Sequence, residues 1–242
     1  MIDRAARRFR PTLWASITTA LALAILFGLG SWQLQRLSWK EQLIADVRER
    51  TAGPPVALPA ELSDPAIEFT LVEVEGRFQH DKELQLASRT YEGRVGSHVI
   101  TPFVLSDGRG LMVDRGWVPP EHLDPETRAD NRPVGQQRLE GYLRLGGWRG
   151  MAAFRPENQP GIGLYIWPDL ASMAAAAGLL QPVEEVYLVL VPQPGAGRYP
   201  LSQAPPTDLP NNHLMYAYTW YALALVLLVI YVLFHLRRGE EA

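Results

Sequence analysis

His213 is the residue of this sequence with the greatest potential for chemistry, because it stands at the start of an apolar run near the C-terminus. On a helix, the i, i+3, i+4 and i+7 spacing gathers one face: His213, Tyr216, Ala217 and Trp220. An imidazole beside aromatic walls could seat a flat, apolar, metal-bearing macrocycle, with His213 as axial ligand of the metal. The alternative is that His213 and Tyr216 merely lie at the lipid headgroup level. We expect Asn211 and Asn212 to cap this helix.

A second candidate surface lies at the end of another apolar run and consists of Trp32, Gln33 and Arg36. We expect it to lie level with His213 on the same membrane surface. The Arg36 guanidinium could neutralise the carboxylates of a ligand such as haem through charge-assisted hydrogen bonds. The alternative for Arg36 is an arginine that snorkels to the membrane interface.

Arg115 is unusual because strand alternation places it on one face with apolar neighbours, Trp117 among them. A buried guanidinium needs a carboxylate partner. Asp114 should point the other way, so we predict a partner from elsewhere, with Glu73 and Glu75 as candidates. Arg115 and Trp117 are therefore predicted to be structural or partner-binding residues.

Composition excludes several functions. A net charge of -3 and a pI near 6.0 argue against nucleic-acid binding through a basic face. The absence of cysteine removes thiolate metal sites, thiol nucleophiles, copper sites built on a cysteine pair and covalent c-type haem attachment. Ser97 and His98 are adjacent, but no G-x-S-x-G motif supports a hydrolase. We therefore expect no enzymatic activity.

Two charge-free stretches, residues 11–35 and 211–236, are long enough to cross a bilayer, for which roughly 20 residues suffice. A signal peptide is the alternative for the first, although no clear cleavage site follows it. Ser16, Ala20, Ala24 and Gly28 form a stripe of small residues, which favours close approach of another helix. Basic residues precede the first span and follow the second, which predicts cytoplasmic termini at residues 1–10 and 237–242 and an extracytoplasmic domain over residues 36–210.

The central domain has the pattern of a β-rich fold. Apolar and polar residues alternate over residues 70–78 and again at 84–86. Residues 99–105 and 111–118 flank an Asp107-Gly108 hairpin signal, and residues 138–145 and 183–191 supply further strands. We predict helices over 36–50, continuing the first span, and over 169–179, and loops over 119–135 and 192–210. The predicted fold class is a membrane protein of the α+β class, in which two transmembrane helices flank a mainly antiparallel β domain with one or two short helices.

These pieces, in their order, resemble the surfeit locus protein 1 family, whose members are assembly factors of haem-copper cytochrome c oxidase. The resemblance covers nearly the whole chain and rests on these stretches: LGSWQLQRL at 29–37 with WK at 39–40, GRF at 76–78, VITPF at 99–103, DGR at 107–109, VDRGWVP at 113–119, RPEN at 155–158, WPD at 167–169, and NNHLMYA at 211–217 with TW at 219–220.

The resemblance implies that the protein binds haem a transiently and delivers it to the catalytic subunit of the oxidase, with His213 as the haem-iron ligand. Trp32, Gln33 and Arg36 match the family's first-span signature, and Arg115 and Trp117 match its middle signature. The implied partners are the catalytic subunit, haem A synthase and membrane lipid, with no nucleic acid. The implied location is the bacterial inner membrane. The alternative is a cofactor-free scaffold that binds oxidase assembly intermediates or haem A synthase.

Overall fold

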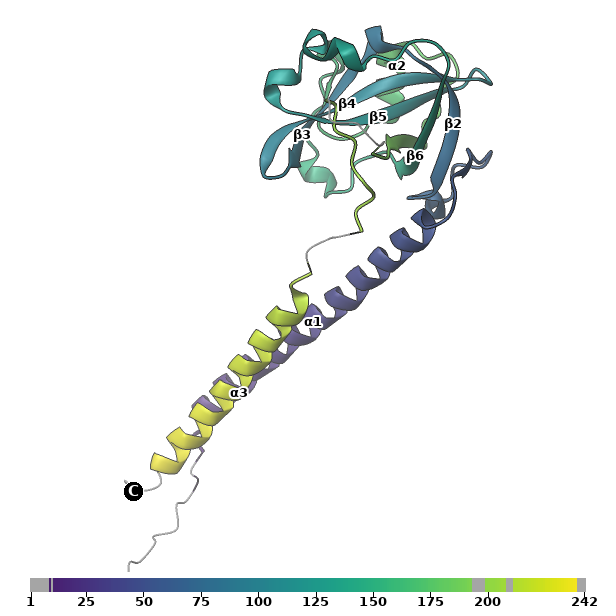
Figure 1. Cartoon of the computed structure of the whole chain (residues 1–242). Helices are drawn as coiled ribbons and strands as arrows, with labels where there is room; N and C mark the ends of the chain where they lie inside the picture. Colours follow the sequence, from purple (N-terminus) through teal and green to yellow (C-terminus); the bar gives the residue numbers. More distant parts are fainter. Residues whose placement is uncertain (1–8, 10, 193–198, 208–210, 239–242) are drawn as a thin grey trace, which may run out of the picture. The chain divides into compact units, whose positions relative to one another are not determined.

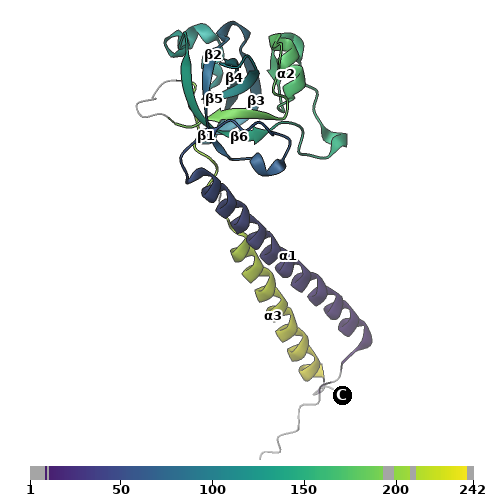
Figure 2. The ribbon, with the colours of Figure 1, turned by 90° about the vertical axis from the view of Figure 1, so that its right-hand side faces the viewer.

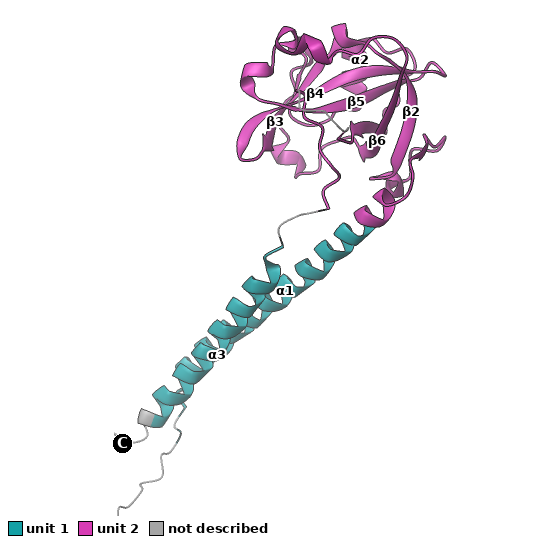
Figure 3. Ribbon diagram, in the orientation of Figure 1, with its two compact units in different colours: residues 1–46, 208–242 teal, residues 47–207 magenta. Residues whose placement is uncertain are grey.

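The computed structural model describes residues 9, 11–192, 199–207 and 211–238, and the chain divides into two compact units. The first unit contains residues 1–46 and 208–242, with helix α3 (His213–Arg238) and all but the last turn of helix α1 (Leu13–Thr51), while the second contains residues 47–207 (Figure 1, Figure 3). Both helices are long and apolar enough to span a membrane. As predicted, α1 continues past the apolar stretch, and it ends at Thr51, just before Gly53, Pro54 and Pro55.

In the first unit, α1 and α3 run antiparallel. The Ser16 hydroxyl lies 2.6 Å from the Tyr231 hydroxyl, and farther along α1 the Ser31 hydroxyl lies 3.2 Å from that of Tyr221. Gly30 is buried where a Cβ would come within 2.6 Å of the Tyr221 ring. Helices in a membrane associate through such close packing and interhelical hydrogen bonds.

The predicted stripe of small residues does not form this interface. Ser16 contacts α3, but Ala20, Ala24 and Gly28 are exposed, and a Cβ on Gly28 would meet no atom within 4 Å. The sequence carries small residues on more than one face of the helix, so their spacing alone did not select the face that includes Gly30.

The second unit contains a sheet whose central strands form a ring: β2 pairs with β6, β6 with β8, β8 with β5, β5 with β4, and β4 again with β2. The strands of the ring are β2 (Leu71–Phe78), β4 (Arg94–Leu105), β5 (Gly110–Val118), β6 (Gln137–Leu145) and β8 (Val186–Leu190). Outside the ring lie β1 (Val56–Ala57), β3 (Leu84–Tyr91) and β7 (Leu164–Tyr165). Most pairings are antiparallel, as predicted, whereas β1–β2, β3–β7 and β5–β8 are parallel.

The core of the second unit lies inside this barrel. Alternation in β2 buries Val72 and Val74, which pack with Phe103, Leu111 and Leu188. The short helix α2 (Leu170–Ala177) lies beside the strands (Figure 2) and buries Leu170, Met173, Ala174 and Ala177. Its ends follow the sequence signals: the Asp169 side chain accepts a hydrogen bond from the Ser172 amide, and Gly178 adopts the left-handed conformation.

The two predicted loops carry more order than expected. Residues 119–135 include 3-10 turns at Pro120–His122 and Pro125–Asn131. In the described part of residues 192–210, Leu201 pairs with Trp117 through two backbone hydrogen bonds of 2.9 and 2.8 Å. The other 3-10 turns are Pro65–Ile67, His80–Lys82, Ala152–Phe154 and Pro160–Ile162.

Candidate functional site

His213 and Gln33, which are 180 positions apart in the sequence, meet in the first unit. His213 is the first residue of α3, and its Nδ1 lies 2.7 Å from Oε1 of Gln33 on α1. An amide oxygen only accepts, so the proton of the neutral imidazole resides on Nδ1 and the lone pair on Nε2. No described residue hydrogen-bonds Nε2. The contact with Gln33 leaves Nε2 of His213 able to coordinate a metal ion. Metal-bound histidines commonly donate the N–H of their other ring nitrogen to a hydrogen-bond partner, which fixes the tautomer and the orientation of the ring.

The other residues of the predicted His213 face differ in how far they are buried. Ala217 is buried at 1% exposure, whereas Tyr216 is 56% exposed. Trp220 is partly buried, and its indole Nε1 is buried without a hydrogen-bond acceptor. Residues at this spacing share a stripe about one-third of the helix circumference wide, and the packing of α1 covers only part of it. An aromatic side chain and an unpaired N–H donor thus lie on the helix that begins with His213.

Trp32 and Arg36, the other two residues of the first-span signature, are exposed. Trp32 is 50% exposed, and Arg36 is exposed with its guanidinium stacked 4.3 Å from the ring centre of Trp39. Among the described residues, no carboxylate forms an ion pair with Arg36. Its charge is therefore available to an anionic group near the Gln33 turn of α1.

The predicted capping by Asn211 is wrong. Its side-chain oxygen Oδ1 is buried and has no hydrogen-bond partner, so it does not accept from the first amides of α3. Oδ1 of Asn211, two residues before His213, is thus a buried polar atom without a partner, as is Nε1 of Trp220.

Arg115 is buried as expected, but the predicted carboxylate partners are wrong. Its side chain is 4% exposed, and Nη1 lies 3.9 Å from Oε2 of Glu83. Arg115 also donates to the backbone carbonyl of Asn131, while Arg128 forms the closer ion pair with Glu83. Glu73 instead pairs with Arg138.

A β-bulge explains why strand alternation misplaced the Arg115 partner. Val99 pairs with Gly116 and Ile100 with Asp114, so Arg115 is the extra residue of β5 at this point. Gly116 follows with φ of +120°, a conformation that favours glycine. A bulge redirects side chains in a way that a strict two-residue period does not describe.

The electrostatics of this cluster fit a structural role. Burial lowers the pKa of Arg115 to about 10, while the charge of Glu83 opposes the shift. Burial also lowers the pKa of the neighbouring His80, whose Nε2 donates to the Pro133 carbonyl at 2.9 Å. Glu83 therefore holds two buried cations, Arg115 and Arg128, inside the second unit.

Trp117 is likewise a packing residue. It is 1% exposed, and its Nε1 donates to the backbone carbonyl of Arg89 at 3.1 Å. Its ring lies 5.4 Å from that of Tyr91. These contacts, with the Leu201 bridge, join three segments of the second unit.

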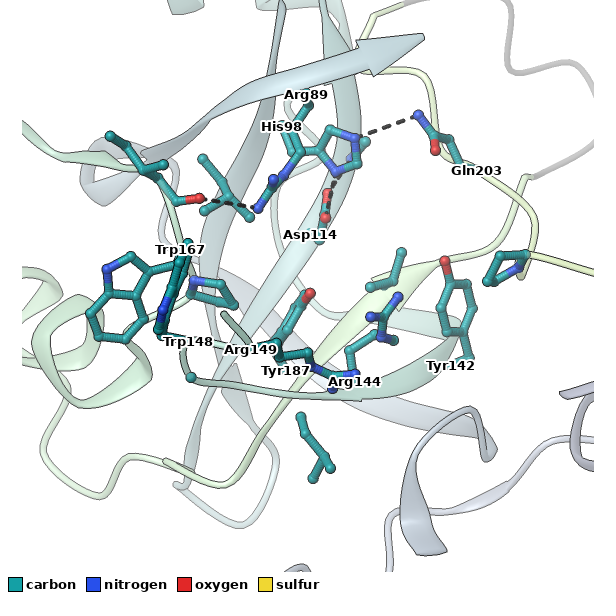
Figure 4. A pocket seen from close by; sticks show the side chains of 18 of the residues that line it. Arg89, His98, Asp114, Tyr142, Arg144, Trp148, Arg149, Trp167, Tyr187 and Gln203 are labelled. Carbon is teal, nitrogen blue, oxygen red and sulfur yellow. Dashed lines mark hydrogen bonds and ion pairs between the residues drawn. The ribbon is translucent and has the colours of Figure 1, made fainter. Parts of the chain in front are cut away.

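A pocket that sequence reasoning missed lies in the second unit, around His98 and Asp114 (Figure 4). His98 Nδ1 lies 2.7 Å from the Asp114 carboxylate, whose other oxygen accepts from the Gly116 amide at 2.9 Å. A signal was present: the hairpin at Asp107-Gly108 pairs Val104 with Gly110, and this register carries His98 to within a few residues of Asp114.

These features define a class of protein: a membrane protein whose sequence has two apolar helices long enough to span a membrane, with a β-barrel domain between them in chain order. A model of the SURF1 family matches residues 20–225. The chain is 32% identical to a SURF1-like protein of Monosiga brevicollis, over all of this chain and 94% of the relative. It is 37% identical to a SURF1-like protein of Drosophila melanogaster, over 83% of this chain and 71% of the relative. Identity to the human Surfeit locus protein 1 is 35%, over 82% and 70% respectively. The chain belongs to the SURF1 family.

Proposed function

We propose that this protein is an assembly factor of haem-copper cytochrome c oxidase that binds haem a in its first unit and delivers it to the catalytic subunit. Membership of the SURF1 family, whose members are generally cytochrome c oxidase assembly factors, supports the assembly role. The hydrogen bond between His213 and Gln33 supports the haem role. The proposed action is binding and transfer, without catalysis.

The residues present fit a haem cargo. Gln33 fixes the His213 tautomer and ring orientation, and Nε2 is left for the iron. The unpaired indole N–H of Trp220 and the exposed ring of Tyr216 offer an aromatic wall with one donor. Arg36, without a carboxylate partner among the described residues, supplies positive charge for the propionates.

The same residues suit release of the cargo. A chain without cysteine forms no thioether bond to haem, so a single histidine would hold it through an exchangeable bond. Transfer to a subunit that supplies its own ligands then requires the breaking of one coordination bond and of weaker contacts.

We place the protein in the bacterial inner membrane with both termini in the cytoplasm and the second unit outside. The two apolar helices and the basic residues that flank them support this orientation. Haem A synthase, which makes the cargo, and the catalytic subunit, which receives it, are the proposed partners.

The experiment is purification of the full chain from cells that make haem a, with a His213→Ala variant and a His122→Ala control from the second unit. Haem content is measured by the pyridine haemochrome spectrum, and circular dichroism verifies folding. We expect at least a tenfold loss of haem in His213→Ala and none in the control. Equal haem content in the folded variant would contradict the ligand role. Haem-free wild-type protein that still co-purifies with the catalytic subunit would favour the cofactor-free scaffold.

A further inference from the structure

The pocket around His98 encloses about 410 Å³ and is built entirely from the second unit. Its volume falls within the range of small-molecule sites. Figure 4 shows Trp148 and Trp167 together at one end, and three arginines, Arg89, Arg144 and Arg149, among the residues that line it. Its apolar lining includes Leu86, Ile166, Pro168 and Val189.

Arg89 differs from the other two arginines of this pocket, Arg144 and Arg149, because both of those pair with a carboxylate. Its guanidinium donates to the Ile166 carbonyl at 3.4 Å, and it forms no ion pair with any carboxylate in the described part of the chain. A guanidinium has five N–H donors arranged in a planar fork that matches a carboxylate. Arg89 is partly buried, so water satisfies these donors less fully than at the surface.

The other two arginines share one acidic partner. Nε of Arg144 lies 2.9 Å from Oε1 of Glu68, and Nη2 of Arg149 lies 2.5 Å from the same oxygen. Burial would raise the pKa of Glu68, but Arg149 and Arg144 together lower it, so its carboxylate stays charged. Asp114 is occupied by His98 and the Gly116 amide. His98 not counted, the three lining arginines and the two carboxylates, Asp114 in the lining and Glu68 behind it, leave an excess of one positive charge.

The tyrosines of the pocket add no negative charge. Burial raises the pKa of Tyr142 and of Tyr187 above the usual value of 10.0. Both phenols remain neutral at physiological pH and offer hydroxyl groups. The excess of one positive charge favours a ligand with one negative charge. The two tryptophans at one end of the pocket favour a flat apolar group on that ligand.

We propose that this pocket binds a small monocarboxylate carried on a flat apolar or aromatic group, with the carboxylate paired to Arg89. The carboxylate would take the planar fork of Arg89, and the apolar body would lie between the aromatic and aliphatic walls. The inference uses the second unit alone and is independent of haem binding by His213.

The test uses the full chain in detergent and a matched pair of probes, 1-naphthaleneacetate and its neutral analogue 1-naphthaleneacetamide, with affinity measured by isothermal titration calorimetry. We expect saturable one-to-one binding of the acetate and at least tenfold weaker binding of the acetamide. Arg89→Gln should weaken acetate binding at least tenfold and leave acetamide binding unchanged. Arg89→Lys, which keeps the charge but not the fork, should give an intermediate affinity.

Arg94→Gln is the matched control, because Arg94 is 58% exposed and pairs with Glu121 outside this pocket. It should bind the acetate as the wild type does. The proposal is overturned if the wild type shows no saturable binding of the acetate, or if folded Arg89→Gln binds it with unchanged affinity. It is equally overturned if Arg94→Gln weakens binding as much as Arg89→Gln, which would indicate a general surface-charge effect.

Discussion

Glu83 is the residue on which the buried charges of the second unit depend, because Arg115 and Arg128 have side chains only 4% and 2% exposed beside it. Removing the shared carboxylate leaves two uncompensated buried cations. We predict that Glu83→Gln lowers the free energy of unfolding by about 3–5 kcal/mol, measured by urea denaturation followed by tryptophan fluorescence.

Glu73→Gln provides the matched control for this prediction. Its partner Arg138 is 68% exposed, so the loss should stay below about 1 kcal/mol. Equal losses in the two variants would contradict the assignment of Glu83 as the partner of Arg115.

His80 gives the second unit a dependence on pH. Burial lowers its pKa from 6.5, and its Nδ1 faces Nη1 of Arg115 at 3.5 Å, so the folded state favours the neutral ring. The unfolded chain binds a proton more readily, and stability therefore falls as the pH drops below about 6.5 through the lowered pKa. We predict a shallower loss of stability between about pH 7 and pH 5 in His80→Gln. An identical slope in variant and wild type would rule out this contribution.

At the scale of elements, the pairing of α1 with α3 depends on Gly30. A Cβ there would come within 2.6 Å of the Tyr221 ring, whereas one on Gly28 would meet no atom within 4 Å. We predict that Gly30→Leu separates the helices and Gly28→Leu does not. Because the chain has no cysteine, spin labels on Thr18→Cys and Val232→Cys report only this pair. Double electron–electron resonance should give a longer and broader distribution of distances between the two spin labels in Gly30→Leu. Unchanged distance distributions in both variants would contradict this helix interface.

Most elements could be predicted from the sequence, because their signals are local. Alternation located β2, the Asp107-Gly108 turn located the β4–β5 hairpin, and Asp169 and Gly178 bounded α2. The parallel β5–β8 pairing and the second pairing of β2 with β4 could not, since they join distant segments and no local pattern encodes them.

At the scale of the whole molecule, the candidate site was predicted as separate residues and not as contacts. The spans and the positions of His213 and Gln33 follow from apolar runs and their ends, but the hydrogen bond between the two depends on helix pairing. The partner of Arg115 was missed because a single extra residue in β5 changes the alternation. Local periodicity thus yields the elements, whereas the partners of buried charges depend on the assembled fold.

Ligation of haem iron by His213 is tested most directly by the spectrum of the ferric, haem-loaded protein in which His213→Cys replaces the proposed ligand. No other cysteine exists in the chain, so a thiolate-ligated haem could arise only from position 213. We predict histidine-type absorption and paramagnetic resonance signals in the wild type and thiolate-type signals in the variant. A variant that retains full haem content and the unchanged wild-type spectrum would contradict ligation by His213.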